Sequence, residues 1–152
     1  MHLNTSKTKE MVIYFGKQYS KSELVYTRIA DSNIERVETF KLLGVIFSSD
    51  LTWRAHVEFI ISKASKRIFV VYQLVRSGLS ASDVISVYIS LIRSILEYAC
   101  PVWHCGITKG QSDEIEGVQR RCLRIVYPEL SDSDALQIGG LEQLRVRRER
   151  LV

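Results

Sequence analysis

The segment FKLLGVIFSSDLTW, residues 40–53, separates two parts of this sequence that have different hydrophobic patterns. Before it, β-branched and aromatic residues form short runs divided by polar turns, which is typical of β-strands. After it, apolar residues recur every three or four positions, which is typical of α-helices. The pattern therefore predicts an α+β protein, with a short antiparallel β portion over residues ~10–47 and a helical bundle over residues ~52–152.

Three runs make up the expected β portion. The runs EMVIYF (residues 10–15) and SELVYTRI (residues 22–29) indicate a hairpin or two neighbouring strands. The third run, residues 37–47, contains Gly44, which either reflects packing alone or permits a bulge or the close approach of another backbone. The side chains that we expect to anchor this run in the core are Leu42, Leu43, Val45 and Ile46.

Four helices are expected in the second half. The first covers residues 53–76, with an apolar arc on one side, basic residues on the other and Gly78 as its stop. The second begins at the N-cap Ser80 and continues to about Tyr98. Because this helix is apolar nearly all round, we expect it to be the most buried one, and Pro101 should end or kink it.

The third helix covers residues 111–127 and ends before Pro128, and a short fourth helix begins at Ser131. After the glycine pair at residues 139–140, the sequence resumes a helical pattern that has no visible stop signal. We therefore expect residues 131–152 to be the start of a further helical segment that is truncated.

The composition is that of one globular domain with a core, since 46% of the 152 residues are hydrophobic and 25% are charged. No stretch reaches the length of an uncharged membrane span, and the N-terminal MHLNTSKTKE is too polar for a secretory signal. Three cysteines at unpatterned spacing favour reduced thiols over a disulfide scaffold. We expect an intracellular protein, nuclear or cytoplasmic, with no membrane partner.

The sequence lacks the motifs of several common enzyme classes, among them a glycine-rich phosphate loop, HExxH and GxSxG. Cys100, His104 and Cys105 in CPVWHC form the one cluster that suggests zinc, but the spacing fits no common zinc site and no fourth ligand is evident. A packed aromatic corner around Trp103 is the alternative. We therefore expect no metal and no cofactor in this chain, while its net charge of +4 is compatible with a polyanionic partner.

Four motifs follow one another along the chain: LNTSKTKEMVIYF, IERVETFKLLGVIFSSDLTWRAHV, KASKRIFVVYQLVRSG and IRSILEYACPVWHCGITKGQSDEIEGVQRRCLRIV. Together they resemble the C-terminal part of the reverse transcriptases of non-LTR (LINE-type, jockey-like) retrotransposons, over essentially all of residues 3–152. The resemblance implies the end of the palm and the primer-grip hairpin in residues 1–50, and a thumb-like helical bundle in residues 51–130. The further helical segment is residues 131–152.

The resemblance also implies roles for individual residues. LN..KT is similar to a palm segment whose lysine lies near the incoming nucleotide, and Lys7 is the matching residue, with an assisting role only in a complete enzyme. FKLLG is similar to the primer grip, which holds the 3′ end of the growing strand. The nucleic-acid-binding residues implied here, together with the basic face of the first helix, are Phe40, Lys41, Leu42, Leu43, Gly44, Val45, Lys63, Lys66 and Arg67. Basic residues contact phosphates whatever the base sequence, although a solvated helix face carries the same residue types.

One departure from the family bears on activity. Its polymerase centre needs an aspartate doublet and a further upstream aspartate to hold two divalent metals, and this chain contains no Asp-Asp pair. The expected function is that of a reverse transcriptase fragment that contacts an RNA–DNA or primer–template duplex and is inactive alone, with Mg²⁺ needed only in the complete polymerase. Its other partners would be the missing palm and fingers, and exposed strands favour self-association.

Two further functions stay open at this point. The chain would also suit a basic module that binds nucleic acid without catalysis, in which case its affinity should depend on salt. It would also suit a helical domain that binds another protein and has no role with nucleic acid, in which case a large apolar surface should be exposed.

Overall fold

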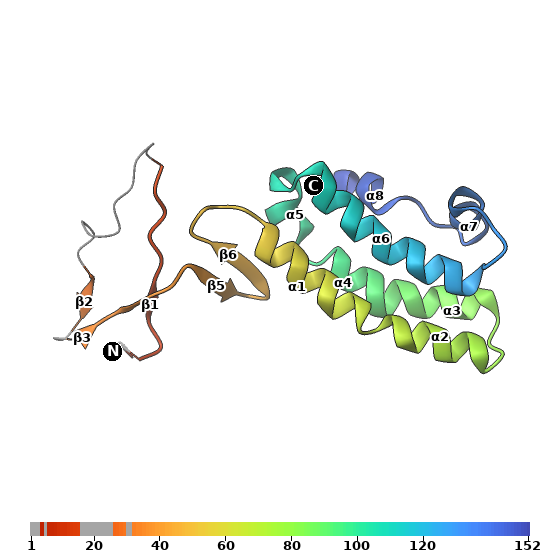
Figure 1. The fold of residues 1–152 in the computed structure, drawn as a ribbon, viewed down its shortest axis with the longest axis horizontal. Coiled ribbons are helices and arrows are strands. Elements are labelled where there is room, and N and C mark those ends of the chain that lie inside the picture. The colour runs from red at the N-terminus through yellow and green to blue at the C-terminus, as the bar shows by residue number, and fades with distance from the viewer. Residues whose placement is uncertain (1–3, 5, 16–25, 30–31) are drawn as a thin grey trace. The chain divides into compact units, whose positions relative to one another are not determined.

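The computed structural model describes residue 4 and residues 6–15, 26–29 and 32–152. It divides into two compact units, Met1–Ala55 and His56–Val152. Short strands occupy the first unit and helices the second, so the predicted α+β class is confirmed (Figure 1).

The described strands of the first unit form three two-stranded ladders: β1 (Lys9–Glu10) with β4 (Glu35–Arg36), β2 (Arg28–Ile29) with β3 (Ser32–Asn33), and β5 (Thr39–Leu42) with β6 (Val45–Ser48). The β1–β4 pair is parallel, so the prediction of a wholly antiparallel portion is wrong for this pair. Residues 11–15, expected as strand, make no ladder, and residues 22–25 lie outside the described part. Strand propensity depends on the side chains of the strand itself. The direction of pairing depends instead on which other segment of the chain forms the neighbouring strand.

The run at residues 37–47 proves to be a hairpin whose two turn residues, Leu43 (φ 47°) and Gly44 (φ 87°), both have left-handed backbones. Positive φ at both central residues is the requirement of a type I′ turn, which matches the twist of the flanking strands. Leu42 is 52% exposed and Leu43 84% exposed, so the prediction that they anchor the core is wrong. Val45, directly after the turn, is buried as predicted. The turn requires Leu43 to project from the tip, which an alternation pattern cannot show.

The rest of the opening segment leads from this hairpin to the first helix. The Asp50 carboxylate accepts hydrogen bonds from the Thr52 backbone N–H and hydroxyl, both at 3.0 Å. These bonds hold the pKa of Asp50 below its ordinary value, the backbone N–H being the larger cause. The rings of Phe47 and Trp53 lie 5.6 Å apart. SSDLTW is therefore a turn fixed by local hydrogen bonds.

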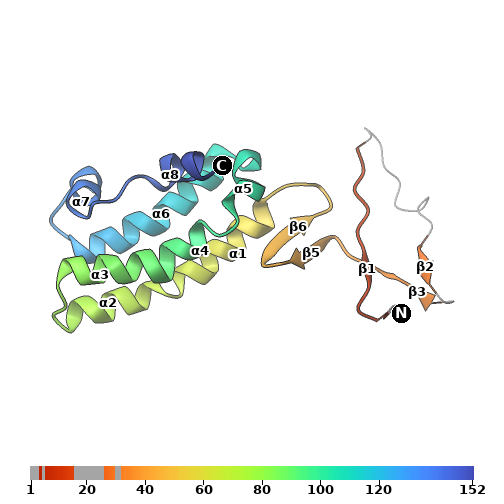
Figure 2. The same ribbon diagram turned by 180° about the vertical axis from the view of Figure 1, so that it is seen from behind.

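The second unit contains a helical bundle, joined in chain order from α1 to α8. Its elements are α1 (Arg54–Ser65), α2 (Ile68–Arg76), α3 (Ala81–Tyr88), the π-helical turn η2 (Ile89–Arg93), α4 (Ser94–Leu96), α5 (Cys100–Trp103), the 3₁₀ turn η3 (His104–Gly106), α6 (Lys109–Val126), α7 (Asp132–Ile138) and α8 (Leu144–Leu151). The run α3–η2–α4 packs against both α2 and α6, and α6 also packs directly on α2 (Figures 1 and 2).

The predicted helix starts are confirmed by their caps. Ser80 accepts a hydrogen bond from the Asp83 backbone N–H and Ser131 accepts one from Asp134, each at 3.2 Å. The third helix begins two residues earlier than predicted, because Thr108 and Gln111 form a reciprocal capping box. The spacing T-x-x-Q was the signal for this start.

The buried side chains of the bundle come mainly from its three long helical segments. The run α3–η2–α4 contributes Val84, Tyr88, Ile92 and Leu96, α1 and α2 contribute Val57, Ile60, Ala64 and Val71, and α6 contributes Ile115, Val118, Cys122 and Leu123. The prediction that the second helix lies at the centre of the bundle is wrong, because α2 and α6 also pack against each other and its Ser86, Ser90 and Ser94 are exposed.

By length and composition alone, one helical run of the described residues, Ala81–Gly106, would be able to cross a membrane. The core helix of a soluble protein meets the same criterion. Ile92 and Leu96 of this run are fully buried inside the bundle, and its charged pair Arg93 and Glu97 is largely buried beside them. In all, 39% of the apolar window of this run is buried inside the protein.

The prediction of one unbroken helix over residues 53–76 is wrong, because the helix is interrupted at Lys66 and Arg67. At this break the Arg67 side chain turns into the bundle, and its Nη1 donates a hydrogen bond to the Leu91 carbonyl oxygen at 2.9 Å. Leu91 belongs to η2, where the run α3–η2–α4 departs from α-helical geometry. A break in one helix thus faces an irregular turn in its neighbour, and one guanidinium connects them.

We expect Arg67→Ala to lower the free energy of unfolding by about 2 kcal/mol, because a hydrogen bond from a charged donor to a partly buried carbonyl is lost. Chemical denaturation followed by far-UV circular dichroism measures this change. Lys66→Ala, at the neighbouring exposed position, is the control and should change stability by less than about 0.5 kcal/mol. Equal effects of the two substitutions would contradict the structural role of Arg67.

Candidate nucleic-acid interface

The six predicted primer-grip residues all lie on the β5–β6 hairpin (Figure 1). Phe40 is 40% exposed and pairs across the ladder with Phe47, and Lys41 is exposed and pairs with Ile46. Adjacent residues of a strand point to opposite faces, so Phe40 and Leu42 share one face while Lys41 lies on the other. The hairpin thus presents an apolar tip with a cation beside it.

Lys7 lies apart from this hairpin in the sequence, within a tight turn. The backbone N–H groups of Lys7 and Thr8 both donate to the Asn4 carbonyl oxygen at 3.1 Å, and the Thr8 hydroxyl donates to it at 2.9 Å. The Lys7 residue is exposed. Asn4, Lys7 and Thr8 of the LN..KT motif are therefore brought together by local hydrogen bonds.

The three predicted basic residues of the helical unit differ from one another. Lys63 and Lys66 are exposed, three residues apart, one at the end of α1 and the other at the break that follows. Arg67 is half-buried and its guanidinium is engaged by the Leu91 carbonyl. Two of the three residues are thus available to phosphates, while the third holds the bundle together.

Arg121 of α6 adds a positive charge beside these lysines. Its Nη2 donates a hydrogen bond to the Ser65 hydroxyl at 2.9 Å, which places the guanidinium next to the α1–α2 break. The position of Arg121 beside the α1–α2 break depends on how α6 packs, so no signal in the sequence indicated it.

The CPVWHC cluster is a packed corner of the bundle. Trp103 is fully buried, its indole N–H donates to the Tyr98 carbonyl at 2.9 Å, and its ring lies 5.5 Å from the ring of His56. Cys100 is buried whereas Cys105 is exposed, and burial raises the pKa of the Cys100 thiol. Within the described ranges, no group of three His, Cys, Asp or Glu side chains is placed to hold a metal ion.

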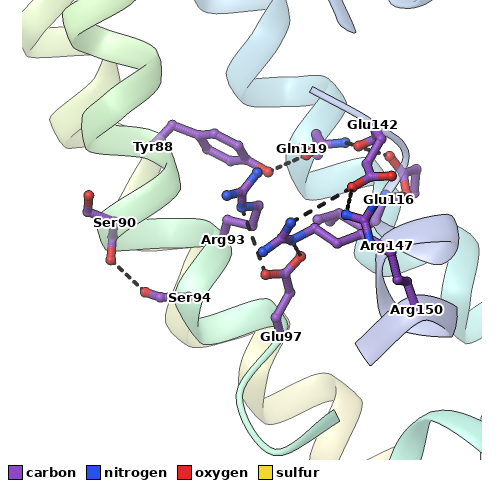
Figure 3. Close-up of polar contacts among 11 residues, drawn as sticks. Tyr88, Ser90, Arg93, Ser94, Glu97, Glu116, Gln119, Glu142, Arg147 and Arg150 are labelled. Carbon is purple, nitrogen blue, oxygen red and sulfur yellow. Dashed lines mark hydrogen bonds and ion pairs between the residues drawn. The ribbon is translucent and has the colours of Figure 1, made fainter. Parts of the chain in front are cut away.

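A polar network that sequence analysis did not anticipate connects α8 to the rest of the bundle (Figure 3). Glu97, just after α4, forms an ion pair with Arg147 at 2.6 Å and a longer one with Arg93 at 3.8 Å. Glu142, before α8, pairs with Arg147 at 3.8 Å and also with Arg150. Ionised partners of this kind raise the pKa of Arg147, chiefly through Glu97.

The same network includes two buried uncharged side chains (Figure 3). The Tyr88 hydroxyl donates to the Gln119 Oε1 at 2.6 Å, and the Gln119 amide nitrogen donates to Glu116 Oε1 and to the Glu142 carbonyl. Glu116 in turn accepts a hydrogen bond from the Leu144 backbone N–H at 2.8 Å. Buried polar groups need such partners, so the network is part of the scaffold that holds α6 to the segment before α8.

Arg148 of α8 is fully buried next to His104. Its Nη2 donates to the Ser112 hydroxyl at 2.7 Å, its Nε lies 3.4 Å from His104 Nδ1, and its guanidinium carbon is 5.9 Å from the Trp103 ring centre. Burial, and secondly the positive charge of Arg148, hold the pKa of His104 below its ordinary value of 6.5. Burial also lowers the pKa of His56. Both imidazoles are therefore most stable in the neutral form in the folded bundle.

These histidines predict a loss of stability in mild acid. Below pH 6.5 the unfolded chain takes up protons that the folded His56 and His104 resist, so the free energy of unfolding should fall between pH 7 and pH 5. Urea denaturation across this range measures the slope, and His104→Gln should reduce it. A stability that is constant or rises on acidification in this range would contradict the prediction.

Comparison of the chain with protein-family models, with curated proteins and with solved structures finds no match.

Proposed function

We propose that this chain is the primer-grip and thumb part of a non-LTR retrotransposon reverse transcriptase, which contacts an RNA–DNA or primer–template duplex. The observation that carries the proposal is the β5–β6 hairpin, with its left-handed Leu43–Gly44 turn and exposed tip. In sequence it is followed at once by a helical bundle that exposes Lys63 and Lys66. The order of these elements is the order in which the family's motifs resemble this chain.

The hairpin suits a primer grip for a physical reason. A two-residue type I′ turn requires positive φ at both central residues. The backbone of the tip is therefore held in one conformation by the two strands that it joins. A ladder from Thr39↔Ser48 to Leu42↔Val45 supports that tip. In the complete polymerase, Phe40, Lys41, Leu42, Leu43, Gly44 and Val45 would position the primer end, and Lys7 would assist nucleotide addition.

The exposed lysines suit contacts to the duplex backbone. Phosphate contacts require positive charge and are independent of base sequence, so they position a duplex without selecting it. Lys63 and Lys66, one helical turn apart, would contact phosphates, while Arg67 supports them through its bond to Leu91. Neither metal nor cofactor has a role in this part, and Mg²⁺ would act at aspartates in the missing palm.

Removal of either exposed lysine should weaken duplex binding in a salt-dependent way. For Lys63→Ala or Lys66→Ala we expect the slope of log affinity against log salt to decrease by about 1, the value of one phosphate contact. Fluorescence anisotropy of a labelled RNA–DNA duplex, titrated at several salt concentrations, measures this slope. Lys109→Ala removes the same charge at the start of α6 and is the matched control. An unchanged slope in both variants at positions 63 and 66 would contradict the proposal.

The proposal also makes a prediction about catalysis. The purified chain should not extend a primer on an RNA template with Mg²⁺ or Mn²⁺, because it contains no Asp-Asp pair. Co-expression with an upstream palm and fingers segment should restore extension, and that activity should decrease on Lys7→Ala. Primer extension by the chain alone would rule out the assignment of these residues.

A binding module without catalysis is the second candidate, and the missing Asp-Asp pair favours it. Both candidate functions use the same contacts to the duplex. They predict different coding sequences upstream of this chain in its gene. An aspartate doublet encoded in frame upstream would favour the polymerase. An unrelated upstream exon would favour the binding module.

A further inference from the structure

Helix α2 exposes two aromatic rings on its solvent side. Phe69 is 65% exposed and Tyr72 is 47% exposed, whereas Val71 of the same helix is fully buried. At about 100° per residue, four exposed residues fall within one arc opposite Val71, with the exposed Val70 outside it. We call these four the α2 strip: Phe69, Tyr72, Gln73 and Arg76.

The sequence around the α2 strip has an excess of positive charge. Residues 59–82 contain four cations, Lys63, Lys66, Arg67 and Arg76, and no aspartate or glutamate, although the exposed Glu58 and Asp83 flank this stretch. Lys66, in the break before α2, and Arg76, its last residue, are exposed, and the Arg76 guanidinium carbon lies 5.7 Å from the centre of the Tyr72 ring. A partner of this surface is therefore negatively charged and able to contact aromatic rings.

Single-stranded nucleic acid fits both requirements, because its phosphates are negative and its unpaired bases have free faces on which aromatic rings stack. Inside a duplex each base is stacked on both faces, which leaves only the two terminal base pairs with a face for Phe69 or Tyr72. Residues three apart on a helix lie about 5–6 Å from each other, so the two rings can engage neighbouring bases. From Ile68 to Arg76 the helix rises about 12 Å, so the α2 strip is long enough to contact more than one nucleotide.

We propose that the α2 strip binds single-stranded nucleic acid, with Phe69 and Tyr72 stacking on unpaired bases while Lys66 and Arg76 contact the phosphates on either side. This inference rests on the proposed function, since it adds an unpaired segment of template or displaced strand to the duplex contacts. A protein partner with an apolar surface is the competing occupant. The absence of acidic residues over residues 59–82 favours a polyanion instead.

The test compares the full-length chain and its variants on two labelled probes, a short single strand and a blunt RNA–DNA duplex. Phe69→Ala should weaken single-strand binding by about tenfold, the effect of one lost base–aromatic stack, and leave duplex binding unchanged. Tyr98→Ala, a similarly exposed aromatic between α4 and α5, is the matched control and should change neither affinity. Because Phe69 is exposed, its truncation leaves the core intact.

A second variant reports stacking directly. Phe69→Trp should retain single-strand affinity, and its added tryptophan emission should be quenched on binding when compared with the parent chain, which contains Trp53 and Trp103. If the parent chain binds neither probe, the proposed function fails together with this inference. If it binds duplex but Phe69→Ala leaves single-strand affinity unchanged, only the inference is overturned. The inference is also overturned if Phe69→Ala abolishes self-association in light scattering without affecting single-strand binding.

Discussion

The constraint on which the helical unit depends is the mutual packing of three helical segments, α2, the run α3–η2–α4 and α6. A helix in such a bundle must find partners inside the protein for every polar group that it buries. Here the Leu91 carbonyl is bonded by Arg67, the Tyr88 hydroxyl by Gln119 and the Glu97 carboxylate by Arg147. Each partner comes from a different surrounding segment. The pairing of buried polar groups therefore helps to fix how these segments pack against the run α3–η2–α4.

This constraint divides the positive charges of the bundle into two sets. The inner set, which includes Arg67, Arg147 and Arg148, is wholly or partly buried and makes hydrogen bonds or ion pairs with the scaffold. The outer set, Lys63, Lys66 and Arg76 among them, is exposed. Inner cations are costly to desolvate and are held by their partners, whereas outer cations can exchange water for phosphate. A net charge alone conceals this division, because both sets contribute equally to it.

Helix starts were predictable from the sequence because their causes are local. Ser80 and Ser131 cap backbone groups only three residues away, and Thr108 would have been found by the same rule. The hairpin was harder, since Gly44 could indicate packing, a bulge or a turn. The break at Arg67 could not be predicted, because the apolar residues before and after it keep the spacing of one continuous helix. At this break Arg67 bonds to Leu91, which lies 24 residues further along the chain.

The sequence by itself determined the α+β class, the order of strands before helices, the caps and the concentration of positive charge between residues 59 and 82. These properties follow from periodicity and from interactions within one turn of backbone. Only the tertiary structure decided that β1 pairs in parallel with β4, that Leu43 projects into solvent, and that Arg67 faces inward while Phe69 faces outward. Each of these features depends either on a segment that is distant in sequence or on the backbone angles of one turn. Hydrophobic periodicity carries information about neither.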